Sequence, residues 1–215
     1  KQTKPLRKGD FSGAFLQMGV AEFTMSAVCI GIALHGGVVP ACGTFFAFSD
    51  YMKPAIRVAA LMGTPAIFIW THDAFRVGED GPTHQPVEQE AQIRLMEKLQ
   101  NHHGENSMLV LRPADGHETT VAWKMALENG NTPTGLILSR QNITELPARE
   151  SRFQEALQAE KGAYIVMEDP GFDVILLASG SEVSTLVEGA GLLSKDGIKT
   201  RVVSVPSEGL FRSQS

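Results

Sequence analysis

The sequence has few cysteines, few aromatic residues and no long run of charge of one sign. It contains two cysteines, Cys29 and Cys42, both in apolar surroundings and at a spacing that fits no metal or redox motif. We therefore expect reduced core residues, as is typical of a cytoplasmic protein. The net charge is -5, and no cluster of Lys or Arg is long enough to follow a phosphate backbone. Nucleic acid is therefore not expected as a partner.

Long apolar segments are also lacking. A membrane helix needs about 20 apolar residues, and the longest candidate, residues 23–34, is shorter and is flanked by Glu22 and His35. We expect no association with a membrane. The basic residues 1–8 lack the apolar segment of a secretory signal and do not begin with Met, and the chain ends without a helix cap or breaker. We expect a piece of a longer protein.

What is present is enough apolar sequence for one large domain or two small ones, with 43% apolar and 20% charged residues in 215. Apolar runs and helical periodicity alternate along the first two thirds of the chain. This alternation predicts βαβ units and a parallel sheet flanked by helices. The expected strands are 38–42, 65–70, 108–111 and 134–138, and the expected helices are 19–34, 46–62, 87–100 and 118–127.

A polar, weakly patterned segment follows at residues 141–162, and the alternation then restarts. The second part is expected to contain strand 174–178, helix 182–193 and strand 201–205, which is one βαβ unit and too little to close a sheet. We therefore expect three parts. They are a domain at 1–145, a linker at 146–162 and an incomplete second α/β domain at 163–215.

Glu22 is an acid inside the apolar segment 19–25. An unpaired carboxylate is costly to bury. One interpretation is a Glu in the first turn of a helix, where the helix dipole favours it. The other is an acid that shares a proton with a ligand. The local sequence favours the first.

An aromatic stripe, Phe45, Phe48 and Tyr51, occupies positions i, i+3 and i+6 of an expected helix. Such a stripe is most often part of the core. A flat heteroaromatic ring held between these side chains is the sharper alternative.

The polar loop at residues 71–86 directly follows an expected buried strand, where open α/β sheets bind ligands. It contains His72, Arg76, Asp80 and His84. A merely solvated loop and a metal site are the alternatives. The spacing of the two histidines and Asp80 matches no compact zinc pattern, so a metal is the weaker of them.

Several segments, in family order from about Met18 to the end, resemble the transketolase family. Residues 78–89, Gly-Glu-Asp-Gly-Pro-Thr-His-Gln-Pro-Val-Glu-Gln, resemble its signature nearly residue for residue. The others are 19–23 (its catalytic-glutamate segment), 32–37, 44–51 (its cofactor-ring pocket), 138–142 (its substrate-phosphate strand end) and 178–183 (the opening of its last domain). Joint chance agreement is implausible. The resemblance therefore favours the functional interpretation at each position.

The resemblance implies a thiamine-diphosphate-binding fold of the pyrimidine-domain type, lacking its first strand region, followed by the start of a C-terminal domain. Glu22 would hydrogen-bond the pyrimidine N1′ of thiamine diphosphate and exchange a proton with it, and Phe45, Phe48 and Tyr51 would hold the ring. The cofactor would supply the carbanion chemistry.

The same resemblance implies a substrate site for sugar phosphates. His72 and Arg140 would bind the phosphate end through charge, Asp80 would contact a substrate hydroxyl, and His84 would assist proton transfers beside the reacting carbon.

Two features depart from the family. The family binds the diphosphate and its metal, Mg²⁺ or Ca²⁺, through a Gly-Asp-Gly…Asn segment of an N-terminal domain, whereas this chain has only Gly-Asp-Phe at 9–11. Those ligands are expected in a domain missing from this chain. The connection at 95–109 is longer than usual, and no role is assigned to its His102 and His103.

The implied activity is transfer of a two-carbon ketol unit between sugar phosphates, in the pentose phosphate pathway, by a cytoplasmic homodimeric transferase. This chain alone is expected to be inactive. Dihydroxyacetone synthase, which uses formaldehyde as acceptor, is a close alternative. A non-catalytic half that pairs with a separate cofactor-binding subunit is another.

Overall fold

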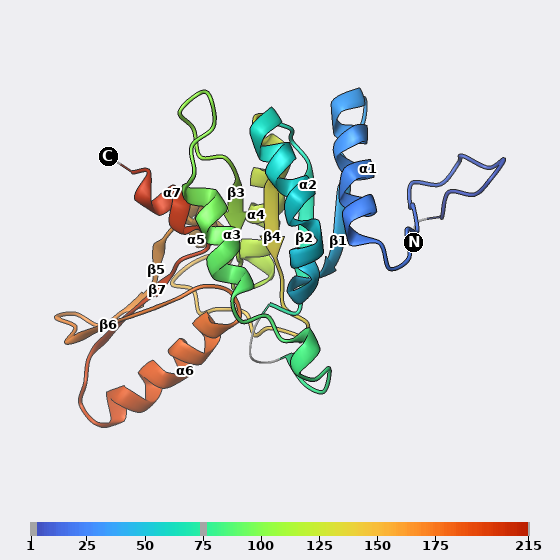
Figure 1. Ribbon diagram of the computed structural model, residues 1–215. Coiled ribbons are helices and arrows are strands. Elements are labelled where there is room, and N and C mark those ends of the chain that lie inside the picture. The colour runs from blue at the N-terminus through green and yellow to red at the C-terminus, as the bar shows by residue number, and fades with distance from the viewer. Residues whose placement is uncertain (1–3, 74–76, 215) are drawn as a thin grey trace.

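A four-stranded parallel sheet forms the centre of the first part of the chain. The computed structural model describes residues 4–73 and 77–214. The strand order is β1-β2-β4-β3, and each neighbouring pair is parallel, which confirms the expected fold class (Figure 1). The strands are β1 (Ala41–Phe45), β2 (Ile67–Thr71), β3 (Leu109–Leu111) and β4 (Thr134–Ile137).

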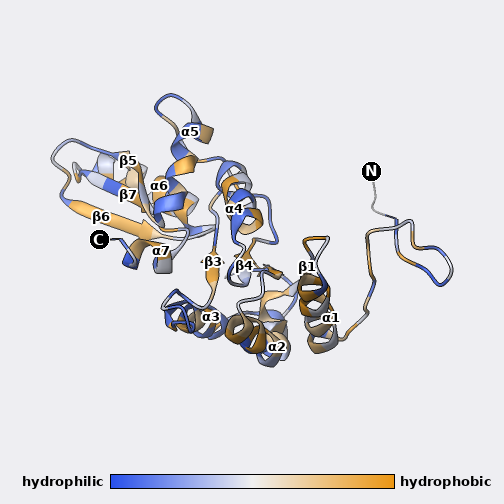
Figure 2. Ribbon diagram, turned by 90° about the horizontal axis from the view of Figure 1, so that it is seen from above, coloured by the Kyte–Doolittle hydropathy of each residue, from blue (hydrophilic) through white to orange (hydrophobic). Residues whose placement is uncertain are grey.

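Helices cover both faces of this sheet. Seen from above, α1, α2 and α3 lie in a row on one face, and α4 lies on the other (Figure 2). Short 3₁₀ segments, η1 and η3, precede α2 and α3. The bounds are α1 (Glu22–His35), η1 (Phe46–Phe48), α2 (Ser49–Met62), η3 (Pro82–His84), α3 (Gln89–Lys98) and α4 (Gly116–Glu128).

The core of this part is packed around β2. Phe46, Met52, Phe68 and Trp70 are fully buried in one apolar cluster, and the Trp70 indole N–H donates to the Met52 sulfur at 3.3 Å. On β4, a Cβ at Gly135 would lie 2.5 Å from Cζ3 of Trp70. The close contact between the strand backbone and the indole therefore requires glycine at this position.

Helix α1 differs from the buried helix that its sequence predicts. Ser26, Cys29 and Ile30 are buried against the sheet and α2, but Phe23 is 53% exposed and Leu34 is 60% exposed. The helix is apolar on all sides and lies at the end of the row in Figure 2. No other described element covers its outer face. Cys29 and the half-buried Cys42 are both free thiols.

The second part is a three-stranded sheet in the order β5-β7-β6. Strands β6 (Val174–Ala178) and β7 (Thr200–Ser204) are parallel and joined by α6 (Glu182–Lys195), as expected. Strand β5 (Tyr164–Glu168), which the sequence analysis missed, pairs with β7 in antiparallel orientation. The chain ends with α7 (Glu208–Arg212), which was also not predicted.

The expected linker contains two short helices, α5 (Arg152–Ala156) and η4 (Leu157–Lys161), both of which contact α4. Arg152 anchors α5 because its buried guanidinium donates to Asp115 at 2.5 Å and to Glu118 at 3.3 Å. These long-range ion pairs explain why local sequence pattern did not reveal the helices. No helix among the described residues is long and apolar enough to cross a membrane.

Candidate functional site

Every predicted site residue lies beside the carboxyl-terminal edge of the four-stranded sheet. Phe45 ends β1 and pairs in register with Thr71 at the end of β2, so His72 emerges next to it. Arg140 follows β4, the other neighbour of β2, three residues after its end. Parallel strands bring together at one edge residues that are far apart in sequence.

An aromatic row faces this edge. The Phe45 and Phe48 rings are nearly parallel with centroids 6.0 Å apart, and Phe48 and Tyr51 are 6.2 Å apart. Tyr51 is 62% exposed, and neither Phe is fully buried. The core interpretation of this stripe is therefore wrong, because Phe46 and Met52 fill the core instead.

Glu22 begins α1, so it occupies a first helical turn as the simpler interpretation predicted. Its carboxylate is half-buried and accepts a hydrogen bond from the Thr44 hydroxyl at 3.5 Å, the limit for such a bond. Thr44 directly precedes Phe45, so the carboxylate lies at the end of the aromatic row. The carboxylate keeps the capacity to hydrogen-bond a ligand.

Two histidines contact the aromatic row. The His72 ring stacks on Phe45 with centroids 3.7 Å apart, and the His84 ring meets Phe45 and Phe48 edge-on at 5.8 and 5.1 Å. His72 has φ = +63°, a left-handed conformation found at no other non-glycine residue among those described. Such strain is characteristic of functional sites.

Hydroxyl groups fix the orientation of both imidazoles. Thr71 Oγ1 lies 2.9 Å from Nδ1 of His72, and Thr83 Oγ1 lies 2.8 Å from Nδ1 of His84. Each leaves Nε2 as the ring nitrogen available to other groups. Sequence reasoning did not single out Thr44, Thr71 or Thr83. The available signal was their position next to Phe45, His72 and His84 in the chain.

Asp80 lies between His72 and Arg140. Its Oδ2 is 3.5 Å from Nε2 of His72 and 3.5 Å from Nε of Arg140. This oxygen is buried and has no hydrogen bond within the described part of the chain. The arrangement fits a ligand hydroxyl that would donate to Asp80 beside the Arg140 charge.

The pKa of His72 is lowered, chiefly by burial and further by the Arg140 and His84 charges, while Asp80 and Asp73 oppose the shift. The lowered pKa favours the neutral imidazole near pH 7. It therefore does not favour binding of a phosphate by a charged His72, and it leaves Arg140 as the cation of the pair. The phosphate-binding roles of both residues stay predictions. Arg76 lies outside the described residues.

Gln89 was also missed, although it lies within the signature segment. Its amide donates to Asp50 Oδ2 at 2.9 Å, and its oxygen accepts from the Val87 backbone at 2.8 Å. It therefore ties the loop that carries His84 to α2, which carries Tyr51. Asp50 also pairs with Lys53.

The donor set fits a flat aromatic heterocycle with a proton-exchanging nitrogen, because it combines an available carboxylate with parallel aromatic rings. It does not fit a metal ion. Among the residues that the structure describes, no group of three or more His, Cys, Asp or Glu could hold one.

Comparison with protein families gives two matches. Residues 1–145 match the family described as "Transketolase, pyrimidine binding domain". Residues 162–215 match the "Transketolase-like TK C-terminal domain".

Individual proteins agree with these matches. A transketolase of Halalkalibacterium halodurans is 49% identical over 209 residues, which are 97% of this chain and 30% of that protein. The structure of Pichia stipitis transketolase in complex with sedoheptulose-7-phosphate superposes with a TM-score of 0.87 at 38% identity, covering 100% of this chain and 31% of that one. A structure described as "Split gene transketolase, inactive beta4 tetramer" is 27% identical, with a TM-score of 0.68 over 90% of this chain and 57% of that one. The chain therefore spans about 30% of the length of the curated relative.

Proposed function

This chain belongs to the transketolase family, and we propose that it supplies the pyrimidine-binding half of a thiamine diphosphate site. The whole enzyme would transfer a two-carbon ketol unit from a ketose phosphate to an aldose phosphate, as in the pentose phosphate pathway of the cytoplasm. The observation that carries the proposal is the convergence of Glu22, the aromatic row and the Asp80–Arg140 pair at one edge of the sheet.

Toward the cofactor, Phe45, Phe48 and Tyr51 would hold the pyrimidine ring, and Glu22 would hold a proton at N1′. When bound, the cofactor supplies the stabilised carbanion that ketol transfer needs. The diphosphate and its metal, Mg²⁺ or Ca²⁺, would be held by an N-terminal domain. In a homodimer that domain would belong to the other subunit.

Toward the substrate, Arg140 would bind the phosphate of the sugar through its planar guanidinium, which suits two parallel hydrogen bonds. Neutral His72 would add a hydrogen bond, and the unsatisfied Oδ2 of Asp80 would accept from a hydroxyl. His84 contacts the rings of both Phe45 and Phe48, which would place it beside the bound pyrimidine ring. From there it would move protons at the reacting carbon.

The test is Glu22→Gln in the full-length protein. Gln cannot exchange the proton, so kcat should fall by about 10²–10⁴-fold while thiamine diphosphate still binds, as measured by calorimetry. Glu79→Gln, an exposed acid of the nearby loop, is the matched control and should leave kcat unchanged. If the variant turns over near the wild-type rate with the cofactor bound, Glu22 is not the residue that exchanges the proton.

A second candidate is a separate half that pairs with a cofactor-binding subunit. The resemblance to the split-gene transketolase favours it. The intact mass of the protein isolated from its cell distinguishes the two, because a separate half would be far lighter than the curated relative, of which this chain spans about 30%.

A further inference from the structure

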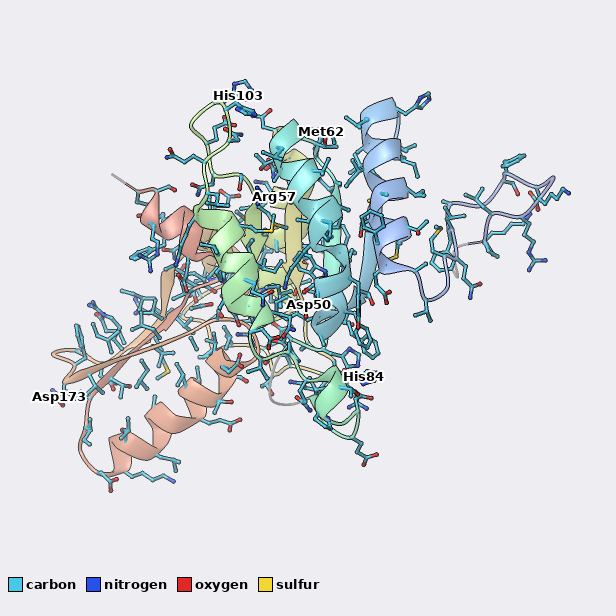
Figure 3. The ribbon with its side chains drawn as sticks, viewed as in Figure 1. Asp50, Arg57, Met62, His84, His103 and Asp173 are labelled. Carbon is cyan, nitrogen blue, oxygen red and sulfur yellow. The ribbon has the colours of Figure 1, made fainter. Side chains whose placement is uncertain are left out.

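A cavity open to solvent lies between α2 and α3, away from the site described above, and its lining residues Leu61 and Leu99 are partly exposed. Its volume is about 560 Å³, within the range of small-molecule pockets. Figure 3 shows Arg57 and His103 toward the end of the molecule opposite His84. The floor and walls are largely apolar and are formed by Pro54, Ala60, Leu61, Met96 and Leu99.

The longer connection between α3 and β3 forms one wall of this cavity, through Gln100, Asn101, His102 and Ser107. It is held by hydrogen bonds. The Asn101 side-chain oxygen accepts from the backbone of His103 and Glu105 at 2.9 and 3.0 Å, and the Ser107 hydroxyl donates to the Met96 carbonyl at 2.6 Å. The connection therefore adds an ordered wall to the groove between the two helices.

The charge of the lining has one sign. Lys53 and Arg57 are the charged residues of the lining, and the described lining residues include no Asp or Glu. Lys53 is paired with Asp50. Arg57 is exposed to solvent, and its guanidinium has neither an ion pair nor a hydrogen bond with any described residue. An uncommitted guanidinium beside an apolar floor favours an anion with an apolar body.

We propose that this cavity binds an amphipathic monocarboxylate, with its carboxylate on Arg57 and its short apolar chain against Leu61, Met96 and Leu99. Arg offers two parallel hydrogen bonds to a carboxylate, and the apolar walls stabilise the chain by removing it from water. A sugar phosphate has no apolar body and would leave these walls unfilled. The proposal concerns a second site and does not depend on the proposed function.

Octanoate is the probe, and chemical-shift mapping of the ¹⁵N-labelled 215-residue chain is the measurement. Saturable shifts should cluster on α2, α3 and residues 99–107. 1-Octanol, which has the same chain without the charge, should bind at least tenfold more weakly. Ribose 5-phosphate should not shift these residues. Equal binding of octanol and octanoate, or octanoate shifts centred on α1, would overturn the proposal.

Arg57→Glu should weaken octanoate binding by about tenfold or more. Arg7→Glu makes the same change of charge at an exposed position on the N-terminal arm and should leave the affinity unchanged. Gln92→Trp should also abolish binding, because the indole would occupy the cavity that Gln92 lines. Equal effects of the two Arg variants, or retained binding in the Trp variant, would contradict the site.

Discussion

At the residue scale, His72 combines a strained backbone with a perturbed imidazole. Its φ of +63° points the side chain back over Phe45, and burial of the ring lowers its pKa. Asp80 acts against this shift and Arg140 acts with it. The protonation state of His72 therefore depends on two neighbours that sequence places 8 and 68 positions away.

The pKa of His72 should lie below 6.5 in the folded chain, as followed by NMR titration of its ring nitrogens. Asp80→Asn should lower this pKa further, and Arg140→Ala should raise it, because they remove charges of opposite sign. The sign for stability follows from the lowered value. Above pH 6.5 His72 is unprotonated in both states, and its contribution to the free energy of unfolding is fully present. As the pH falls through the folded-state pKa, protonation disfavours the folded state and this contribution is lost. Titration of His72 above pH 6.5 in the unliganded chain would contradict the assignment.

Arg140→Ala in the full-length protein should weaken the binding of phosphorylated sugars much more than the binding of unphosphorylated ones. A charge-assisted contact contributes about 1.5–3 kcal/mol, so KM for the phosphorylated sugar should rise by roughly tenfold to a hundredfold. Arg149→Ala, at an exposed position in the expected linker, is the control. Equal losses on both kinds of sugar would show that Arg140 acts on another part of the substrate.

At the scale of elements, a buried arginine joins the two sheets. Arg112 follows β3 and donates to Asp73 after β2 at 2.9 Å, and to Glu182 at the start of α6 at 2.6 Å. It also pairs with Glu90 on α3 at 3.3 Å. Arg112 and Asp73 are almost fully buried. Because Asp73 directly follows His72, this cluster connects the second part of the chain to the strained residue of the site.

Arg112→Met should destabilise the chain by about 3–5 kcal/mol, because it leaves the buried Asp73 carboxylate without its cation. Urea unfolding measures the change. Lys124→Met removes a lysine whose ion pairs with Glu128 and Glu160 are exposed, and it should change stability little. Equal effects of the two variants would show that the buried cluster contributes no more than a surface pair.

At the scale of the whole molecule, the outer face of α1 is the largest structural departure from the sequence prediction. Its Phe23 and Leu34 are large apolar side chains exposed at the surface, as is Tyr51 of α2. Apolar faces of this kind promote association. The chain by itself should therefore self-associate.

Leu34→Glu should reduce this association, measured by sedimentation velocity across protein concentrations. Leu127→Glu is matched in exposure, at 59% against 60% for Leu34, and lies on α4 at the other face of the sheet. It should leave association unchanged. A monomeric wild-type chain, or equal effects of the two variants, would show that the chain does not associate through α1.

The chain alone should also bind thiamine diphosphate weakly and carry out no ketol transfer. Its candidate groups reach the pyrimidine ring, whereas most of the cofactor's charge is on the diphosphate. Calorimetric titration with the cofactor and Mg²⁺ is the measurement. Micromolar or tighter binding, or any ketol transfer by this chain, would show that it contains more of the site than we propose.

The sequence by itself determined the parallel α/β fold, because strand and helix periodicities are local properties of the chain. Strand β6 and the start of α6 lie where the pattern predicted them. The candidate site residues were also predicted from the sequence, through the resemblance of residues 78–89 and the other segments to one family. Their local patterns left the alternatives open.

Only the tertiary structure decided which face of a periodic segment meets the core. Phe45, Phe48 and Tyr51 line a partly exposed edge of the sheet. Phe46 and Met52 are the residues of this segment that pack into the core. Strand β5 and the α5 helix depend on β7 and on Asp115, which are far away in sequence. The lowered pKa of His72 likewise follows from burial and from distant charges. These features arise from long-range contacts, which a local sequence pattern does not encode.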